Sequence, residues 1–132
     1  MNALEKVRRI VAAALDKKAV DPVVFHTEAL TDLADYIVVM SGTSDRHVRS
    51  IAGGVEELLI SIKDKPIGIE GEKEGRWVLV DCADVIVHVF HQPVREYYDL
   101  ERLWMDAPRL IPDVSGEKLV STPGAPKTRN RR

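Results

Sequence analysis

The chain has 132 residues, which is enough for one domain and too few for two cores of ordinary size. It is 45% apolar and 30% charged, as is typical of a globular protein. No apolar run approaches the roughly 20 residues that span a bilayer, and segment 1–9 lacks the apolar run of a secretory signal. A single cysteine, Cys82, cannot form a disulfide within the chain. We therefore expect no membrane contact and a place in the cytoplasm, or inside a bacterium-derived organelle.

The net charge of −2 is divided unevenly along the chain. Residues 1–20 carry +3, residues 21–106 hold seventeen acidic against eight basic groups, and residues 107–132 carry +4. A nucleic-acid binder usually presents a basic face, and the central part has the opposite sign. An acidic body suits a basic partner, because complementary potentials accelerate encounter. The alternative is that the carboxylates only keep the domain soluble.

The first half of the chain predicts helices and buried strands. Apolar residues recur at helical spacing over 4–15, and Asn2 is placed to cap that helix. Strands are predicted at 23–27 and 36–40, the second with the continuous apolar run of a strand covered on both faces. A second helix is predicted over 48–62, where the apolar spacing is again helical.

The second half predicts a hairpin, a further strand and a third helix. Segments 67–70 and 76–81 form the arms of the hairpin, around a polar turn bounded by glycines. A strand is expected at 85–90, and a helix with one apolar face over 94–104. These elements predict an α/β fold, with one five-stranded mixed sheet and flanking helices.

The domain is expected to span residues 1–106. Residues 107–132 hold four prolines and end in a basic run, so we expect a disordered tail there. Contact with nucleic acid is at most secondary, through phosphate neutralisation by the run 127–132.

Enzyme chemistry finds little support in the sequence. The turn Ser41-Gly42-Thr43-Ser44 between a buried strand and a helix can present backbone N–H groups to an anion, as a nucleotidyltransferase does, but it is also ordinary capping sequence. Two carboxylates that share a metal from one strand should lie two residues apart, whereas Asp81 and Asp84 lie three apart. We therefore expect no catalytic residues.

Cysteine and histidine give no recognisable metal or nucleophile pattern. Cys82, His88 and His91 do not match the spacing of a four-ligand zinc site. Cys82 paired with His88 or His47 lacks any sign of an oxyanion hole or an orienting acid. We expect no metal and no cofactor.

The segment 76–81 is apolar on both alternating faces, so each face must be covered by something. Trp77 is either a packed core ring or the anchor of an interface.

Five stretches of the chain, taken in order, resemble the ribosomal silencing factor family, also called Iojap-like. The resemblance covers roughly residues 3–106, and its last stretch is the longest and most specific. The stretches are Asp35-Tyr36, residues 41–48, Glu70-Gly71 with residues 77–81, residues 84–90 and residues 94–104.

The resemblance implies a translation factor without enzymatic activity. Members of the family bind the large ribosomal subunit through its ribosomal protein fourteen and obstruct joining of the small subunit, which lowers translation when nutrients are scarce. The family's fold is similar to that of nucleotidyltransferases. The alternatives are a nucleotidyltransferase-like enzyme and a protein-interaction domain with another basic partner.

Under this resemblance the second arm of the hairpin is the predicted partner-binding site, with acidic residues at its rim. The predicted residues are Trp77, Val78, Leu79 and Val80, with Glu70 and Asp81 as the rim. Four other family positions are expected to hold the sheet and the last helix together through ion pairs and caps, namely Asp35, Asp84, Arg95 and Glu101. Arg46 and His47 are either surface residues or part of a homodimer contact.

Overall fold

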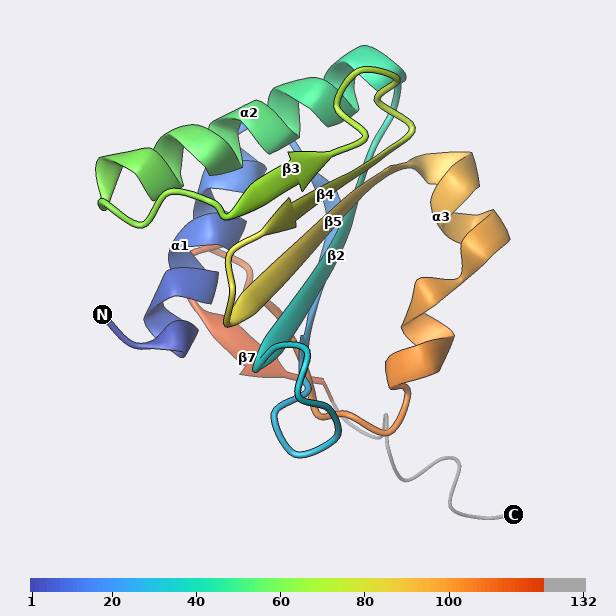
Figure 1. The fold of residues 1–132 in the computed structure, drawn as a ribbon. Coiled ribbons are helices and arrows are strands. Elements are labelled where there is room, and N and C mark those ends of the chain that lie inside the picture. The colour runs from blue at the N-terminus through green and yellow to red at the C-terminus, as the bar shows by residue number, and fades with distance from the viewer. Residues whose placement is uncertain (123–132) are drawn as a thin grey trace.

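The computed structural model describes residues 1–122 of the chain. Figure 1 shows a sheet with helices on both faces. The elements are α1 (Ala3–Asp16), β1 (Val20–His26), β2 (Tyr36–Gly42), α2 (Asp45–Ser61), β3 (Gly68–Glu70), β4 (Trp77–Asp81), β5 (Val85–His91), α3 (Gln92–Tyr98), the 3-10 helix η1 (Leu100–Trp104), β6 (Arg109–Pro112) and β7 (Leu119–Ser121).

The strands form one mixed sheet in the order β3-β4-β5-β2-β1-β6-β7. β2 and β5 pair in parallel at the centre, and the other neighbouring strands pair antiparallel. The expected α/β class and mixed sheet are confirmed. The expected number of five strands is wrong, because the sheet has seven.

The two additional strands lie in the proline-rich segment that was predicted to be a tail. Leu110 of β6 pairs with Val24 of β1, and a turn then leads to β7. Asp113 fixes this turn, since its carboxylate accepts the N–H of Gly116 at 2.9 Å. Pro112 is the last residue of β6, so it does not interrupt that strand. The basic run 127–132 lies outside the described residues.

The two long helices begin at side-chain caps. Asn2 accepts the N–H of Glu5 at 2.8 Å, as the sequence predicted. Ser44 accepts the N–H of His47 at 3.0 Å, so α2 starts at the end of the loop after β2. The loop therefore serves as a cap for the helix.

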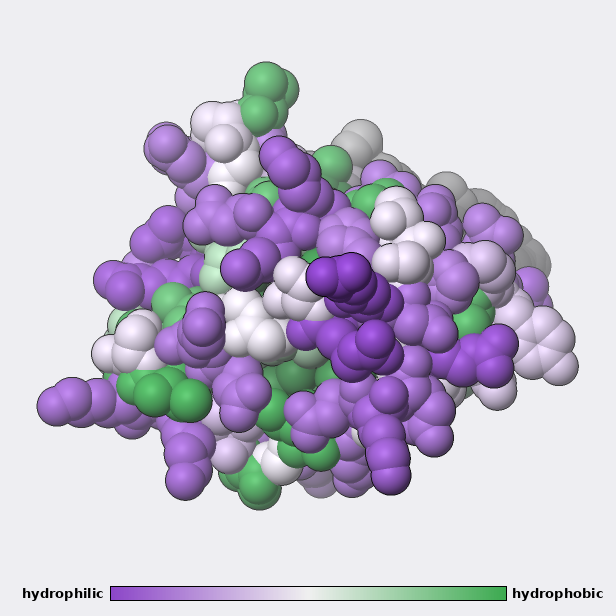
Figure 2. Space-filling model, turned by 90° about the horizontal axis from the view of Figure 1, so that it is seen from above, coloured by the Kyte–Doolittle hydropathy of each residue, from purple (hydrophilic) through white to green (hydrophobic). Residues whose placement is uncertain are grey.

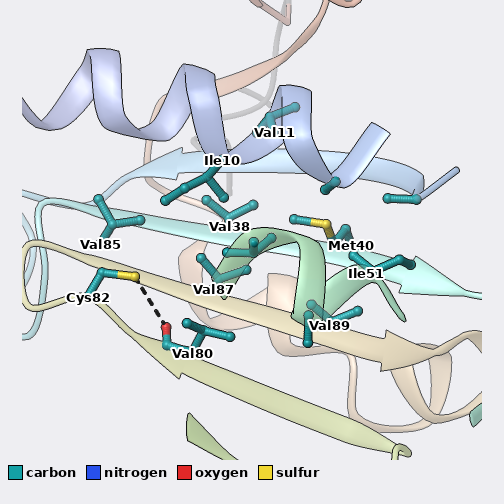
Figure 3. Close-up of a cluster of buried hydrophobic side chains, with 14 of the residues drawn as sticks. Ile10, Val11, Val38, Met40, Ile51, Val80, Cys82, Val85, Val87 and Val89 are labelled. Atoms are coloured by element: carbon teal, nitrogen blue, oxygen red, sulfur yellow. Dashed lines mark hydrogen bonds between the residues drawn. The ribbon is translucent and has the colours of Figure 1, made fainter. Parts of the chain in front are cut away.

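The helices α1 and α2 pack against each other over one face of the sheet. Figure 3 shows Ile10 of α1 and Ile51 of α2 among the valines of β2 and β5. Val38, Val87 and Val89 are fully buried there. Each such side chain contributes about 1.5–3 kcal/mol relative to an exposed one, so this cluster is the main core of the fold.

The opposite face carries a smaller core under α3 and η1. The predicted helix over 94–104 is interrupted, because Asp99 adopts a left-handed conformation with φ of 48° and ends α3. Leu100 and Trp104 pack inward, whereas Tyr97 and Leu103 are 81% and 70% exposed. The prediction of one helix with a single buried apolar face over 94–104 is therefore wrong.

No helix within residues 1–122 is both long enough and apolar enough to cross a membrane. Seen from above, the surface is mostly hydrophilic, with separate small apolar patches (Figure 2).

An ion-pair cluster joins α1 to the loops beside the sheet. Lys6 is buried, and its ammonium lies 2.8 Å from Asp64 and 2.7 Å from Asp84. It also donates to the carbonyl of Cys82 at 3.1 Å. Burial alone lowers the pKa of Lys6, but the two carboxylates outweigh it, so the pKa is raised and the ammonium stays charged.

We predict that Lys6→Ala lowers the free energy of unfolding by about 2 kcal/mol, because the buried methylenes and the charge-assisted hydrogen bonds are lost together. Arg9→Ala on the same helix is the control. Among residues 1–122, the ion pair of Arg9 is an exposed one with Glu5, so its removal changes stability by less than about 0.5 kcal/mol. Urea unfolding measures both, and equal losses would contradict the assigned role of Lys6.

Candidate functional site

The side chains of β4 point alternately to the two faces of the sheet. Val78 and Val80 face α2 and are fully buried in the main core. They cannot touch a partner, so their prediction as binding residues is corrected. Trp77, Leu79 and Asp81 face the other side and remain partly exposed. The alternation thus sorts the predicted site into core and surface.

The partly exposed side continues onto β3. Glu70 pairs with Leu79 across the β3–β4 ladder, so the two side chains share a face, and Glu70 is exposed. Asp81 also stabilises the turn after β4, because its carboxylate accepts the N–H of Ala83 at 3.0 Å. We call Glu70, Trp77, Leu79 and Asp81 the Trp77 face.

Trp77 is held by rings from two elements. Its indole lies with its centroid 4.7 Å from that of Phe90 on β5 and 5.0 Å from that of Tyr98 on α3. Its indole N–H donates to His88 Nδ1 at 3.0 Å. Trp77 is therefore packed against the core on one side and partly exposed on the other. A place in the core and a role as an interface anchor do not exclude each other.

Two hollows flank the indole. One of about 400 Å³ lies toward α3 and is lined by Arg76, Pro93 and Tyr97, among others. The other, of about 280 Å³, lies toward β3 and is lined by Glu70, Gly71 and Leu79 together with Trp77. The surface around Trp77 is thus grooved on both sides.

Gly71 directly follows β3 and shapes the hairpin beside Trp77, a role that the sequence did not predict. Its φ is +84°, and a Cβ there would lie 2.0 Å from the carbonyl oxygen of Trp77. Only glycine lets the β3–β4 hairpin close this tightly beside Trp77. The contact of Trp77 with Tyr98 could not be predicted either. Tyr98 lies on α3, and no local sequence pattern shows where that helix packs on the sheet.

His88 is the polar residue buried beneath Trp77. It is 8% exposed, and burial lowers its pKa to about 4. Nδ1 accepts the indole N–H, so the ring is neutral and carries its proton on Nε2. It lies on the opposite face from Cys82, so the cysteine–histidine pairing considered from the sequence does not form.

The remaining enzyme candidates are occupied by structural contacts. Cys82 is buried, and burial raises the pKa of its thiol to about 12. His91 pairs with Asp45 at 3.3 Å, and Ser41 accepts from Arg95 at 2.9 Å. Among residues 1–122, no three His, Cys, Asp or Glu side chains gather to hold a metal ion.

Three of the four family positions expected to form ion pairs or caps do form ion pairs, although Asp84 pairs with α1 and not with the last helix. Arg95 forms an ion pair with Glu101 at 2.9 Å, and Asp84 pairs with Lys6. His47 contacts the carbonyl of Lys17 at 2.7 Å. Arg46 is exposed. The homodimer contact considered for Arg46 and His47 stays a prediction.

Comparisons with known proteins agree with the resemblance seen in the sequence. The family model described as ribosomal silencing factor during starvation matches residues 1–132. The Bacillus subtilis protein named ribosomal silencing factor RsfS is 41% identical over 108 residues, which are 82% of this chain and 92% of the relative. The mouse protein named mitochondrial assembly of ribosomal large subunit protein 1 is 34% identical over 73 residues, covering 53% of this chain and 32% of its own.

A solved structure extends this likeness to the fold. A crystal structure of a Chromobacterium violaceum protein matches with a TM-score of 0.78 and 35% identity, over 96% of this chain and 98% of that one. This single-domain α/β protein thus has a fold already known in a bacterial relative. The chain belongs to the ribosomal silencing factor family, a family of ribosome-associated translation regulators.

We predict that His88 makes stability depend on pH. Its folded pKa of about 4 lies below the unfolded value near 6.5, so the contribution is complete above pH 6.5 and is lost as pH falls toward 4. The loss approaches roughly 3 kcal/mol. Urea unfolding at pH 7 and pH 4.5 measures this loss of stability. His88→Leu is the control, because it has no imidazole to titrate. Equal pH dependence in both proteins would contradict the prediction.

We also predict that Cys82 is unreactive in the folded protein. Because its thiol is buried and has a pKa of about 12, a thiol reagent at pH 8 modifies it only after unfolding. Absorbance of the released chromophore, with and without urea, checks this. Rapid reaction without urea would contradict the assigned burial.

Proposed function

We propose that this chain binds the large ribosomal subunit at ribosomal protein fourteen through the Trp77 face and thereby blocks joining of the small subunit. The observation that carries the proposal is a partly exposed tryptophan, ordered between two hollows and bordered by carboxylates. Family membership and the name of the mouse relative, which refers to the ribosomal large subunit, support the large subunit as the partner.

The chemistry of the Trp77 face suits a basic protein. Trp77 and Leu79 offer apolar area at the centre, and Glu70 and Asp81 add negative charge beside it. An apolar centre with a polar rim is the usual anatomy of a protein interface. Ribosomal proteins are generally basic, so the charge of residues 21–106 favours encounter with one.

Blocking by occupation requires no reaction. A bound domain of this size excludes the small subunit from the surface that it covers, so affinity and placement are the whole mechanism. Repression would operate in the cytoplasm under nutrient limitation, in accordance with the starvation named in the family's description. The nucleotidyltransferase-like topology expected for the family belongs to this proposal too, as a likeness of fold without the catalysis.

Co-sedimentation with isolated ribosomal subunits tests the proposed function. We expect binding to the large subunit alone, and fewer joined ribosomes when the small subunit is added afterwards. Leu79→Lys should weaken binding at least about tenfold, because it places an ammonium against a basic partner. Leu33→Lys is the matched control, since Leu33 is an exposed leucine in the loop before β2.

Binding that Leu79→Lys leaves unchanged would place the docking surface elsewhere. Absence of binding to either subunit would favour a protein-interaction domain with another basic partner, and nucleotide turnover would favour the enzyme.

A photo-crosslink identifies the partner directly. With p-benzoylphenylalanine in place of Leu79, we expect a crosslinked product that contains ribosomal protein fourteen, read by mass spectrometry. The same probe in place of Leu33 should give no such product. A crosslink from Leu79 to a different ribosomal protein would contradict the proposed partner.

A further inference from the structure

His88 is unusual for its place in the sheet. It lies in the middle of β5, and the other β5 side chains from Val85 to Phe90 are apolar. A buried imidazole is costly unless a hydrogen bond compensates for it. His88 has such a bond within residues 1–122, because its Nδ1 accepts the indole N–H of Trp77 at 3.0 Å. The imidazole thus has a specific partner on the Trp77 face.

The register of the ladder places these two side chains together. His88 pairs with Leu79, and Trp77 pairs with Phe90, so Trp77 and His88 are diagonal neighbours on one face. Phe90 and Tyr98 contact the rings of Trp77, and these contacts determine where the indole lies. The hydrogen bond is directional, and it fixes which edge of the indole faces the sheet and which faces the hollows.

We propose that His88 is a positioning residue, which orients Trp77 for docking on the large ribosomal subunit. The inference rests on the proposed function and assigns a role to a residue that does not itself meet the partner. An anchor that is already ordered loses less conformational entropy on binding, so removal of the acceptor should weaken docking without unfolding the domain.

The surroundings keep the imidazole neutral, and so able to accept. Glu70 on β3 and Asp81 on β4 are the carboxylates on this face of the hairpin, and burial is the cause that lowers the pKa of His88. On α3, Arg95 is engaged with Ser41 and Glu101. Tyr98, also on α3, contacts the ring of Trp77.

Two variants of the full chain separate positioning from a purely structural role. His88→Leu keeps an apolar side chain in the core and removes the acceptor. His88→Asn places an amide oxygen where Nδ1 lies, and so restores an acceptor. Urea unfolding at pH 7 verifies that each variant is folded, and we expect His88→Leu to be as stable as the parent.

The first readout is the indole N–H resonance of Trp77 in a ¹⁵N spectrum, assigned with Trp104→Phe. We expect slow exchange with water in the parent and in His88→Asn, and fast exchange in His88→Leu. The second readout is sedimentation with the large subunit. We expect binding about tenfold weaker for His88→Leu and within about threefold of the parent for His88→Asn.

Binding of His88→Leu at the parental level would overturn the inference, as would an unchanged indole exchange rate. If the parent itself fails to bind the large subunit, the proposed function is wrong, and the docking role assigned to His88 is overturned with it. The indole resonance needs no ribosome, so it distinguishes that outcome from a failure of the hydrogen bond.

Discussion

The structure depends on how one strand, β4, is covered on its two faces. Val78 and Val80 are sealed beneath α2, which anchors the β3–β4 hairpin to the main core. The other side of the strand receives only partial cover from α3. Because the sealed face fixes the strand rigidly, the side chains on the open face are presented in a defined arrangement. A docking surface on a regular element is more precise than one on a loop.

Other features of the fold maintain this arrangement. The parallel pair β2 and β5 is buried on both faces and carries the hairpin at its edge. Gly71 lets the hairpin close directly beside Trp77. The pair of Arg95 and Glu101 holds α3 and η1 together where the chain turns at Asp99, and α3 brings Tyr98 onto the indole.

Much of the fold could be predicted from the sequence because it follows local patterns. Both helix caps and the buried strand at β2 were encoded by residues close in sequence. The strands β6 and β7 could not be predicted, because β6 pairs with the distant β1 and β7 pairs in turn with β6, a tertiary arrangement that the proline-rich composition hides. For the proposed site, the residue types predicted an apolar strand, but whether Val78 belonged to the core or the surface depended on which face the helices cover.

The proposed mechanism depends on contact between the Trp77 face and the large ribosomal subunit. Hydroxyl-radical footprinting of the chain, free and bound to purified large subunits, tests it most directly by reporting the exposure of each side chain. We expect oxidation of Trp77 and Leu79 to fall in the complex, while oxidation of Leu33 stays as in the free protein. Unchanged oxidation of Trp77 and Leu79 in a complex that has formed would contradict it.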